Sequence, residues 1–210
     1  RLCLKHGNTR EAVVGYMVFG VIFLGGVMGN HQIGHEYGRL SLALLDKYDN
    51  DRQRAEVNFV YGYFSNSWIN SARDTEQYWK ISYNKGLEIG DWFHTGCGYC
   101  SITQSLFMRG VALKEVEIEA KQFLRRLDRI GGQEPAGAIS AVIQAINNLR
   151  GMTESSISFS NKEFNEDEFV HSLKGYGSRH FAHYYFINKM QCLYFQGEYE
   201  QAHKLIQHSE

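Results

Sequence analysis

Two stretches of sequence decide the predicted fold: residues 32–48 read QIGHEYGRLSLALLDKY, and residues 74–89 read DTEQYWKISYNKGLEI. They share a tyrosine, an aliphatic residue and a serine at an offset of 41: Tyr37, Leu40 and Ser41, then Tyr78, Ile81 and Ser82. Apolar residues recur in both stretches with helical spacing and do not alternate, so both are predicted to be helices. An internal repeat of about forty residues is typical of stacked helical units.

Turn signals divide the first 150 residues into helical hairpins. These signals are Gly29-Asn30, Asn70-Ser71, Gly110 and Gly131-Gly132. The first helices of the hairpins are expected at residues 10–28, 52–69 and 92–109, and the second helices at 32–48, 74–89 and 113–130. A further helix is expected at 135–149, because Pro135 suits the first turn of a helix.

The last sixty residues change in character. Residues 151–165 are polar and have no helical period, which predicts a connector. Helices are expected at 166–174, 178–196 and 198–209. The junction of the last two reads QGEYEQA over residues 196–202 and matches the turn glycine and small residue of a tetratricopeptide hairpin.

We therefore expect an all-α protein, an α–α superhelix in which each hairpin buries its apolar face against its neighbours. The prediction is one helical-repeat domain over residues 1–210, with stacked hairpins at 1–150, the connector at 151–165 and the final helices at 166–210. Since the chain begins at Arg1, we expect it to be a piece of a longer protein.

Composition excludes several classes of protein. The 210 residues carry a net charge of −1, whereas a general nucleic-acid binder needs an excess of Lys and Arg. A content of 43% hydrophobic and 14% aromatic residues excludes global disorder. The four cysteines are sparse and unevenly spaced, and no signal peptide precedes them. We therefore expect a cytoplasmic protein that does not bind nucleic acid.

One stretch is uncharged for eighteen residues: residues 12–29 read AVVGYMVFGVIFLGGVMG. That length reaches the lower limit for a membrane-spanning helix. Five glycines and the lack of a flanking basic cluster favour a different interpretation. We expect a helix enclosed by neighbours on all sides and no membrane span.

Few residues suggest chemistry, and no phosphate-binding loop or GxSxG motif is present. Cys97 and Cys100 form a CxxC, with His94 three residues earlier. A metal site is one interpretation, but a structural zinc usually takes two separated pairs of ligands. Small buried residues at a helix contact are the favoured interpretation. We predict no metal, no cofactor and no catalytic residue.

For the histidines and the acidic residues, too, a structural role is favoured over a chemical one. His31 and His35 have HxxxH spacing, and we expect them on a solvated helix face. His171, His180 and His183 could form a polar or pH-responsive surface. Ordinary surface or core histidines are favoured. The run Glu166-Asp167-Glu168 suits the beginning of a helix, where negative charge is stabilised.

Aromatic residues are the remaining candidates for binding. Tyr61, Phe64 and Trp68 lie on one predicted first helix, and Trp92 lies on the next. If these helices line a concave surface, the four residues could anchor a ligand or partner, because aromatic residues dominate binding hot spots. Core filling is the alternative, and the pattern favours it.

Five segments carry a resemblance to a known family. They are GNHQIGHEYGRLSLALLDKY (29–48), AEVNFVYGYFSNSWI (55–69), KGLEIGDWFHTGCGYC (85–100), FNEDEFVHSL (164–173) and HFAHYYFINKMQCLYFQGEYEQAHKLI (180–206). They resemble the tetratricopeptide-like region of large bacterial multidomain signalling proteins. Those proteins combine a serine/threonine-kinase-like domain, a P-loop ATPase domain, this helical region and often a sensor histidine kinase.

The resemblance implies a non-enzymatic interaction scaffold, whose partners are the neighbouring ATPase or kinase domains or other proteins. The family's catalytic motifs lie outside this region, so no catalytic residue is carried over. The alternative is a sensor that binds a small molecule or peptide in the concave groove of the solenoid. A third hypothesis, an enzyme or metalloprotein built around His94, Cys97 and Cys100, is the weakest.

Overall fold

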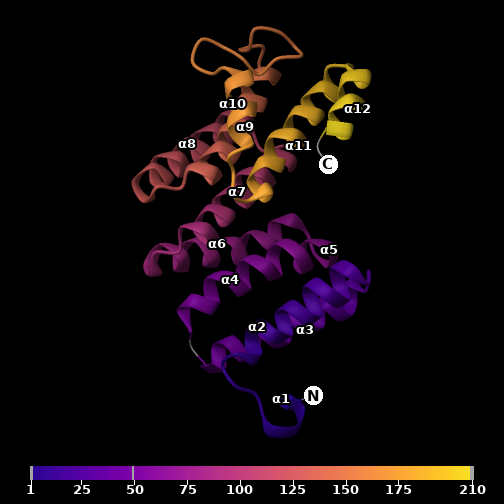
Figure 1. The fold of residues 1–210 in the computed structure, drawn as a ribbon, viewed down its shortest axis with the longest axis vertical. Helices are drawn as coiled ribbons and strands as arrows, with labels where there is room; N and C mark the ends of the chain where they lie inside the picture. Colours follow the sequence, from indigo (N-terminus) through magenta and orange to yellow (C-terminus); the bar gives the residue numbers. More distant parts are fainter. Residues whose placement is uncertain (1, 49, 209–210) are drawn as a thin grey trace. The chain divides into compact units, whose positions relative to one another are not determined.

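A computed structural model describes residues 2–48 and 50–208, and this part of the chain is all-α (Figure 1). The elements are α1 (Leu2–His6), α2 (Ala12–Met17), η1 (Val18–Val27), α3 (His31–Tyr48), α4 (Asp51–Tyr61), η2 (Gly62–Asn66), α5 (Ser67–Ile69), α6 (Ala72–Ile89), α7 (Trp92–Met108), α8 (Leu113–Ile130), α9 (Gln133–Leu149), α10 (Glu166–Leu173), α11 (Arg179–Phe195) and α12 (Tyr199–His208). The segments η1 and η2 are π-helical continuations of α2 and α4.

The predicted helices are confirmed, with ends that differ by at most two residues. The last residue of the helix predicted at 198–209 lies outside the described part of the chain. Residues 151–165 contain no helix, as expected for a connector. Helices adjacent in the sequence pack against each other, for example α8 against α9 and α11 against α12.

Glycines in the left-handed conformation end many of the helices. Gly90 has φ 74° after α6, and Gly131 has φ 75° after α8. The next amide then turns back onto the helix: Asp91 N–H donates to the carbonyl of Gly86 (2.8 Å), and Gly132 N–H to that of Leu127 (3.1 Å). Only glycine adopts this φ without cost, so these positions fix where each hairpin turns.

The chain forms two compact units, one ending at Ser105 and the other beginning at Leu106. The core of the first unit includes Val13, Val21, Leu45, Val57 and Tyr61, contributed by its first three long helical segments. In this unit α3 packs against η1, and α4 packs against α6.

Glycines set the spacing of the hairpin helices in the first unit. A Cβ on Gly20 would overlap Cβ of Tyr37, whereas one on Gly62 would lie 2.8 Å from Nε1 of Trp79 and 3.3 Å from Cβ of Tyr78. Both glycines therefore allow a close approach of the facing helix, at or next to the repeat-related tyrosines.

The prediction for the uncharged stretch at residues 12–29 is wrong in one respect. Val13 and Val21 are buried, but Val18, Phe19 and Phe23 on the other side are about half exposed. The helix is covered on one side only, by α3, α4 and η2. None of the described helices is long and apolar enough to cross a membrane.

The second unit is organised around α9, which is buried along almost its whole length. On one side, α8 packs with the stripe Val116, Ala120, Phe123 and Leu127 and exposes most of its charged residues. On the other side lies α11. On its far side, α11 packs against α12.

Candidate functional site

Helix α11 is apolar on two sides. One side belongs to the core: Ala182, Tyr185 and Cys192 pack with residues of α9, and the Cys192 thiol lies 3.7 Å from the carbonyl oxygen of Ala145. On the other side, Ile187 and Tyr194 are large and exposed. A helix that is apolar all round is normally covered on all sides, so the second side has the composition of a contact surface.

Helix α12 folds back beside α11 through the junction identified in the sequence. Gly197 has φ 81°, and Glu198 N–H donates to the carbonyl of Leu193 (2.9 Å). Ala202 is buried, and its small side chain lets the two helices approach. The predicted turn glycine and small contact residue are therefore confirmed.

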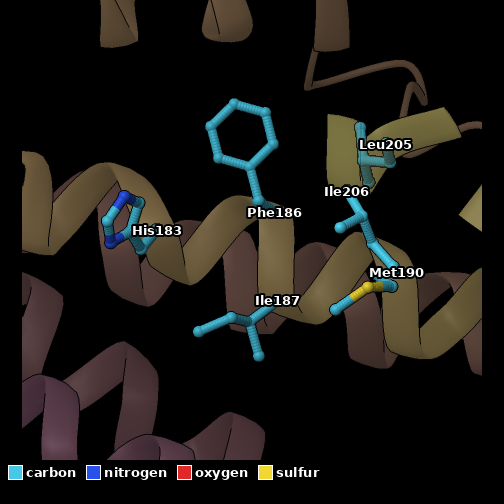
Figure 2. Close-up of a pocket in the computed structure, with 6 residues that line it drawn as sticks. All are labelled: His183, Phe186, Ile187, Met190, Leu205 and Ile206. Carbon is cyan, nitrogen blue, oxygen red and sulfur yellow. The ribbon is translucent and has the colours of Figure 1, made fainter. Parts of the chain in front are cut away.

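An apolar cavity of about 220 Å³ lies between the two helices. Figure 2 shows its lining, which comes from four residues of α11 and two of α12: His183, Phe186, Ile187, Met190, Leu205 and Ile206. An open groove of about 530 Å³ shares three of these residues. Its lining is Met108, Ile187, Met190, Gln191, Tyr194, Tyr199, Ala202, His203 and Ile206. We call the two together the α11–α12 groove.

The lining of this groove is mostly carbon and sulfur. Met108 and Met190 have flexible, polarisable side chains that adapt to irregular apolar partners. One polar atom stands out: Oε1 of Gln191 is buried and has no hydrogen-bond partner within the described residues. That atom is enclosed by the protein and is not presented to the groove. The groove thus suits an apolar side chain.

Burial makes the nearby thiol unreactive. The pKa of Cys192 is raised to about 12, because burial disfavours the thiolate, although Lys189 acts in the opposite direction. Nucleophilic cysteines need a lowered pKa. Cys192 therefore acts as a packing residue between α11 and α9.

The four aromatic residues singled out in the sequence are divided by burial. Tyr61 is 2% exposed and lies in the core of the first unit. Trp68 is 64% exposed and stacks on the ring of His31 at 4.5 Å. Phe64 and Trp92 are also exposed, on η2 and α7 respectively. Partner binding by these residues stays a prediction. Only the three exposed rings are accessible to a partner, since Tyr61 is buried.

Tyr61 is part of a buried polar contact that the sequence pattern did not reveal. Its hydroxyl lies 3.3 Å from Nδ1 of His35, and its ring meets Tyr78 edge-on at 4.8 Å. Burial raises the pKa of Tyr61, and burial also lowers the pKa of His35. The prediction that His31 and His35 share a solvated face is therefore wrong for His35.

The CxxC lies inside α7, and both thiols are fully buried. Burial raises the pKa of Cys97 and Cys100, which disfavours the thiolate that binds metals. The Asp91 carboxylate instead caps the helix: it accepts a hydrogen bond from the backbone N–H of His94 (3.1 Å) and lies 2.6 Å from Nδ1 of the same residue. Burial by itself would raise the pKa of Asp91, but these hydrogen bonds lower it.

Within residues 2–48 and 50–208, no group of three or more His, Cys, Asp or Glu is placed to hold a metal ion. The interpretation of Cys97 and Cys100 as small buried residues at a helix contact is confirmed by their burial. Of the three histidines near the C-terminus, His183 lines the α11–α12 groove, whereas His171 is exposed on α10.

The groove itself was missed by sequence reasoning, although a signal was present. In a tetratricopeptide hairpin the position seven residues before the turn glycine is usually glycine, and here it is Met190. A large, flexible side chain at that position now lines both parts of the groove. Exposed Tyr194 and Tyr199 flank the same turn.

Comparison with known proteins does not identify a relative. No protein-family model matches this chain, and no curated protein or solved structure is significantly similar to it. The fold and the groove define an all-α protein of sequentially packed helices.

Proposed function

We propose that this chain is a tetratricopeptide-like α-solenoid that acts as a non-catalytic scaffold, with the α11–α12 groove as its partner-binding surface. The observation that carries the proposal is the groove: an open apolar groove of about 530 Å³ lined by two methionines and two exposed tyrosines. Exposed apolar surfaces of this kind mark interaction sites.

The occupant we propose is the apolar face of an amphipathic helix from a partner protein. Inside the second unit, α11 covers one side of α9 while α8 covers the other. An incoming helix would pack between α11 and α12 in the groove, as α9 packs between α8 and α11. Side chains at i, i+3, i+4 and i+7 would enter the cavity and the groove, a recurrent mode of helix recognition.

The sequence resemblance supplies the context of this proposal. We propose that the partners are ATPase or kinase domains of a bacterial signal-transduction protein, because that is where similar helical regions occur. The aromatic residues Phe64, Trp68 and Trp92 are three further exposed rings on the first unit. Their role is the same kind of proposal and is tested separately from the groove.

Methionine methyl groups provide the test. The chain has five methionines: Met108 and Met190 line the groove, Met17 is buried in the first core, and Met28 and Met152 are exposed elsewhere. We would label all five with ¹³C and titrate synthetic amphipathic helices with leucine at i, i+3, i+4 and i+7. The proposal expects the methyl signals of Met108 and Met190 to move and that of Met17 to stay in place.

Substitutions sharpen this test. Ile187→Glu and Tyr194→Ala change exposed groove residues and should weaken peptide binding about five- to thirtyfold, since each removes apolar contact worth about 1–2 kcal/mol. Ile118→Glu changes an equally exposed residue of α8, outside the groove, and is the matched control. If every helical peptide leaves Met108 and Met190 unmoved, the groove is not a helix-binding site. A single small molecule that moves them instead would favour the sensor hypothesis.

A further inference from the structure

Imidazole rings are enclosed in both compact units. His35 on α3 is 9% exposed, and His180 on α11 is partly buried. The ring of His180 meets Phe181 and Tyr184 of its own helix. The ring of His35 instead meets Tyr61, which belongs to α4, with ring centroids 5.4 Å apart. The His35 contact therefore joins two helices, and a change in the charge of this ring acts on their packing.

A glycine brings Tyr61 to His35. A Cβ on Gly38 would lie 2.5 Å from the Tyr61 ring, so the absence of a side chain makes room for that ring against α3. Gly38 follows His35 by about one helical turn, and the two residues share one side of α3. The Tyr61 hydroxyl consequently lies 3.3 Å from Nδ1 and 3.4 Å from Nε2 of His35.

The charged neighbours of His35 belong to its own helix. Glu36 follows it directly and Arg39 follows one turn later, and both are exposed. His31, one turn earlier, stacks on Trp68. Four of the segments packed against α3 carry no charged residue, namely α2, η1, η2 and α5. Their ionisable groups are the phenols of Tyr16 and Tyr63.

The charges of α4, the remaining segment packed against α3, lie at its other end. Arg54 donates a hydrogen bond to Asp46 (2.9 Å), whereas Tyr61 lies at His35. These two pairs show that α3 and α4 run antiparallel. The charged residues of α4 therefore lie beside the second half of α3, and His35 meets the uncharged hydroxyl of Tyr61. They are Asp51, Arg52, Arg54 and Glu56.

This environment makes a proton on His35 unfavourable in the folded protein. Burial lowers the pKa of His35, the positive charge of Arg39 also lowers it, and Glu36 acts in the opposite direction. An imidazole in water titrates near pH 6.5. As the pH falls below that value, an opened segment takes up the proton before the closed one does. The closed state then loses stability until the pH reaches the lowered pKa.

We propose that His35 is an acid-sensitive latch between α3 and α4: uptake of a proton separates the start of α3 from Tyr61 while the rest of the unit stays folded. Protonation of enclosed histidines is a general way of shifting a packed contact between two states. This proposal does not rest on the proposed function, because His35 lies in the first unit and the α11–α12 groove in the second.

The test is hydrogen exchange of backbone amides in the full chain between pH 7.5 and 5, corrected for the intrinsic exchange rate at each pH. We expect protection of the first half of α3 to fall by up to tenfold for each pH unit below about 6.5, because opening binds one additional proton. Residues 92–105 of α7 belong to the same unit and are the internal reference. Their protection should stay nearly constant.

His35→Gln keeps a polar side chain but removes the group that titrates in this range. It should make the protection of α3 independent of pH between 7.5 and 5. His180→Gln is the matched control, because it removes the enclosed imidazole of the second unit. It should leave the acid response of α3 unchanged.

Two exposed neighbours test the latch without changing the core, so they remain informative if His35→Gln does not fold. Arg39→Gln removes the like charge and should reduce the acid-induced loss of protection by about twofold. Glu36→Gln removes the opposite charge and should increase that loss by a similar factor. The opposite signs separate an electrostatic effect on His35 from a general loss of helix stability.

The proposal is overturned if the protection of α3 does not depend on pH, or if it still falls in acid in His35→Gln. An equal loss of protection in α3 and in residues 92–105 also overturns it, since the whole unit would then be unfolding. Charge variants that both change the acid response in the same direction would contradict the role of His35.

Discussion

At the scale of single residues, close backbone approach explains why several glycines lie inside helices. Gly20 faces Tyr37, and Gly34 lies so near that its Cβ would be 3.0 Å from the carbonyl oxygen of Gly20. Gly15, in the preceding turn, has no atom within 4 Å of its Cβ position. Two helical glycines in one segment therefore have opposite roles: one is required by packing, and the other is not.

Gly20→Ala should lower the free energy of unfolding by about 2 kcal/mol, because overpacking of this size typically costs 1–3 kcal/mol. Gly15→Ala is the matched control and should raise it by about 0.5–1 kcal/mol, since alanine loses less backbone entropy in a helix. Urea denaturation measures both changes. A neutral Gly20→Ala would contradict the close contact between η1 and α3.

At the scale of elements, a partly buried carboxylate joins the connector to two helices. Glu166 begins α10, and its Oε1 accepts hydrogen bonds from Tyr185 (2.8 Å) and Lys189 (2.5 Å) of α11. Its Oε2 accepts from the backbone N–H of Phe159 (2.8 Å), over whose ring the Lys189 ammonium lies at 4.4 Å. The acidic start of the helix was predicted, but the role of Glu166 in holding residues 151–165 was not.

Glu166→Ala should lower the free energy of unfolding by about 3 kcal/mol, because it leaves the ammonium of Lys189 buried without its partner. Asp167→Ala, one residue later and exposed, is the control, and it should cost well under 1 kcal/mol. Circular dichroism in a denaturant series measures both. Equal effects of the two substitutions would show that the Glu166 contacts do not stabilise the fold.

At the scale of the whole molecule, the two units differ in their fluorescence. All three tryptophans, Trp68, Trp79 and Trp92, lie before Ser105 and therefore in the first unit. Tryptophan emission thus reports the unfolding of that unit, whereas circular dichroism reports helices of both.

We expect Gly20→Ala to shift the fluorescence transition and Glu166→Ala to shift only the transition seen by circular dichroism. The reason is that each substitution removes contacts within one compact core. Parallel urea titrations of the two variants with both probes measure this. If Glu166→Ala shifts the fluorescence midpoint as much as the circular dichroism midpoint, the two units unfold as one.

Much of the fold was open to prediction because it depends on local properties of the chain. Helical spacing of apolar residues placed the helices, and glycines such as Gly131 and Gly197 placed the turns, since a left-handed φ is a property of the residue itself. The small Ala202 likewise marked the contact between the last two helices.

The candidate sites depend on which side of each helix meets a neighbour. Tyr61 and Trp68 lie two turns apart and are both aromatic, yet one is buried and the other exposed. His35 is similarly buried by a tyrosine 26 residues away. The spacing of residues along one helix carries no information about such distant partners.

The sequence alone determined that this protein is all-α, where its helices begin and end, and which junction joins α11 to α12. Only the tertiary structure decided that η1 exposes one apolar side, that Cys97 and Cys100 are buried, and that Met190 lines a groove. The physical reason is the sequence separation over which each property is set. Helix periodicity and turn conformation depend on residues only a few positions apart. Burial instead depends on side chains that are distant in the sequence and come together only on folding.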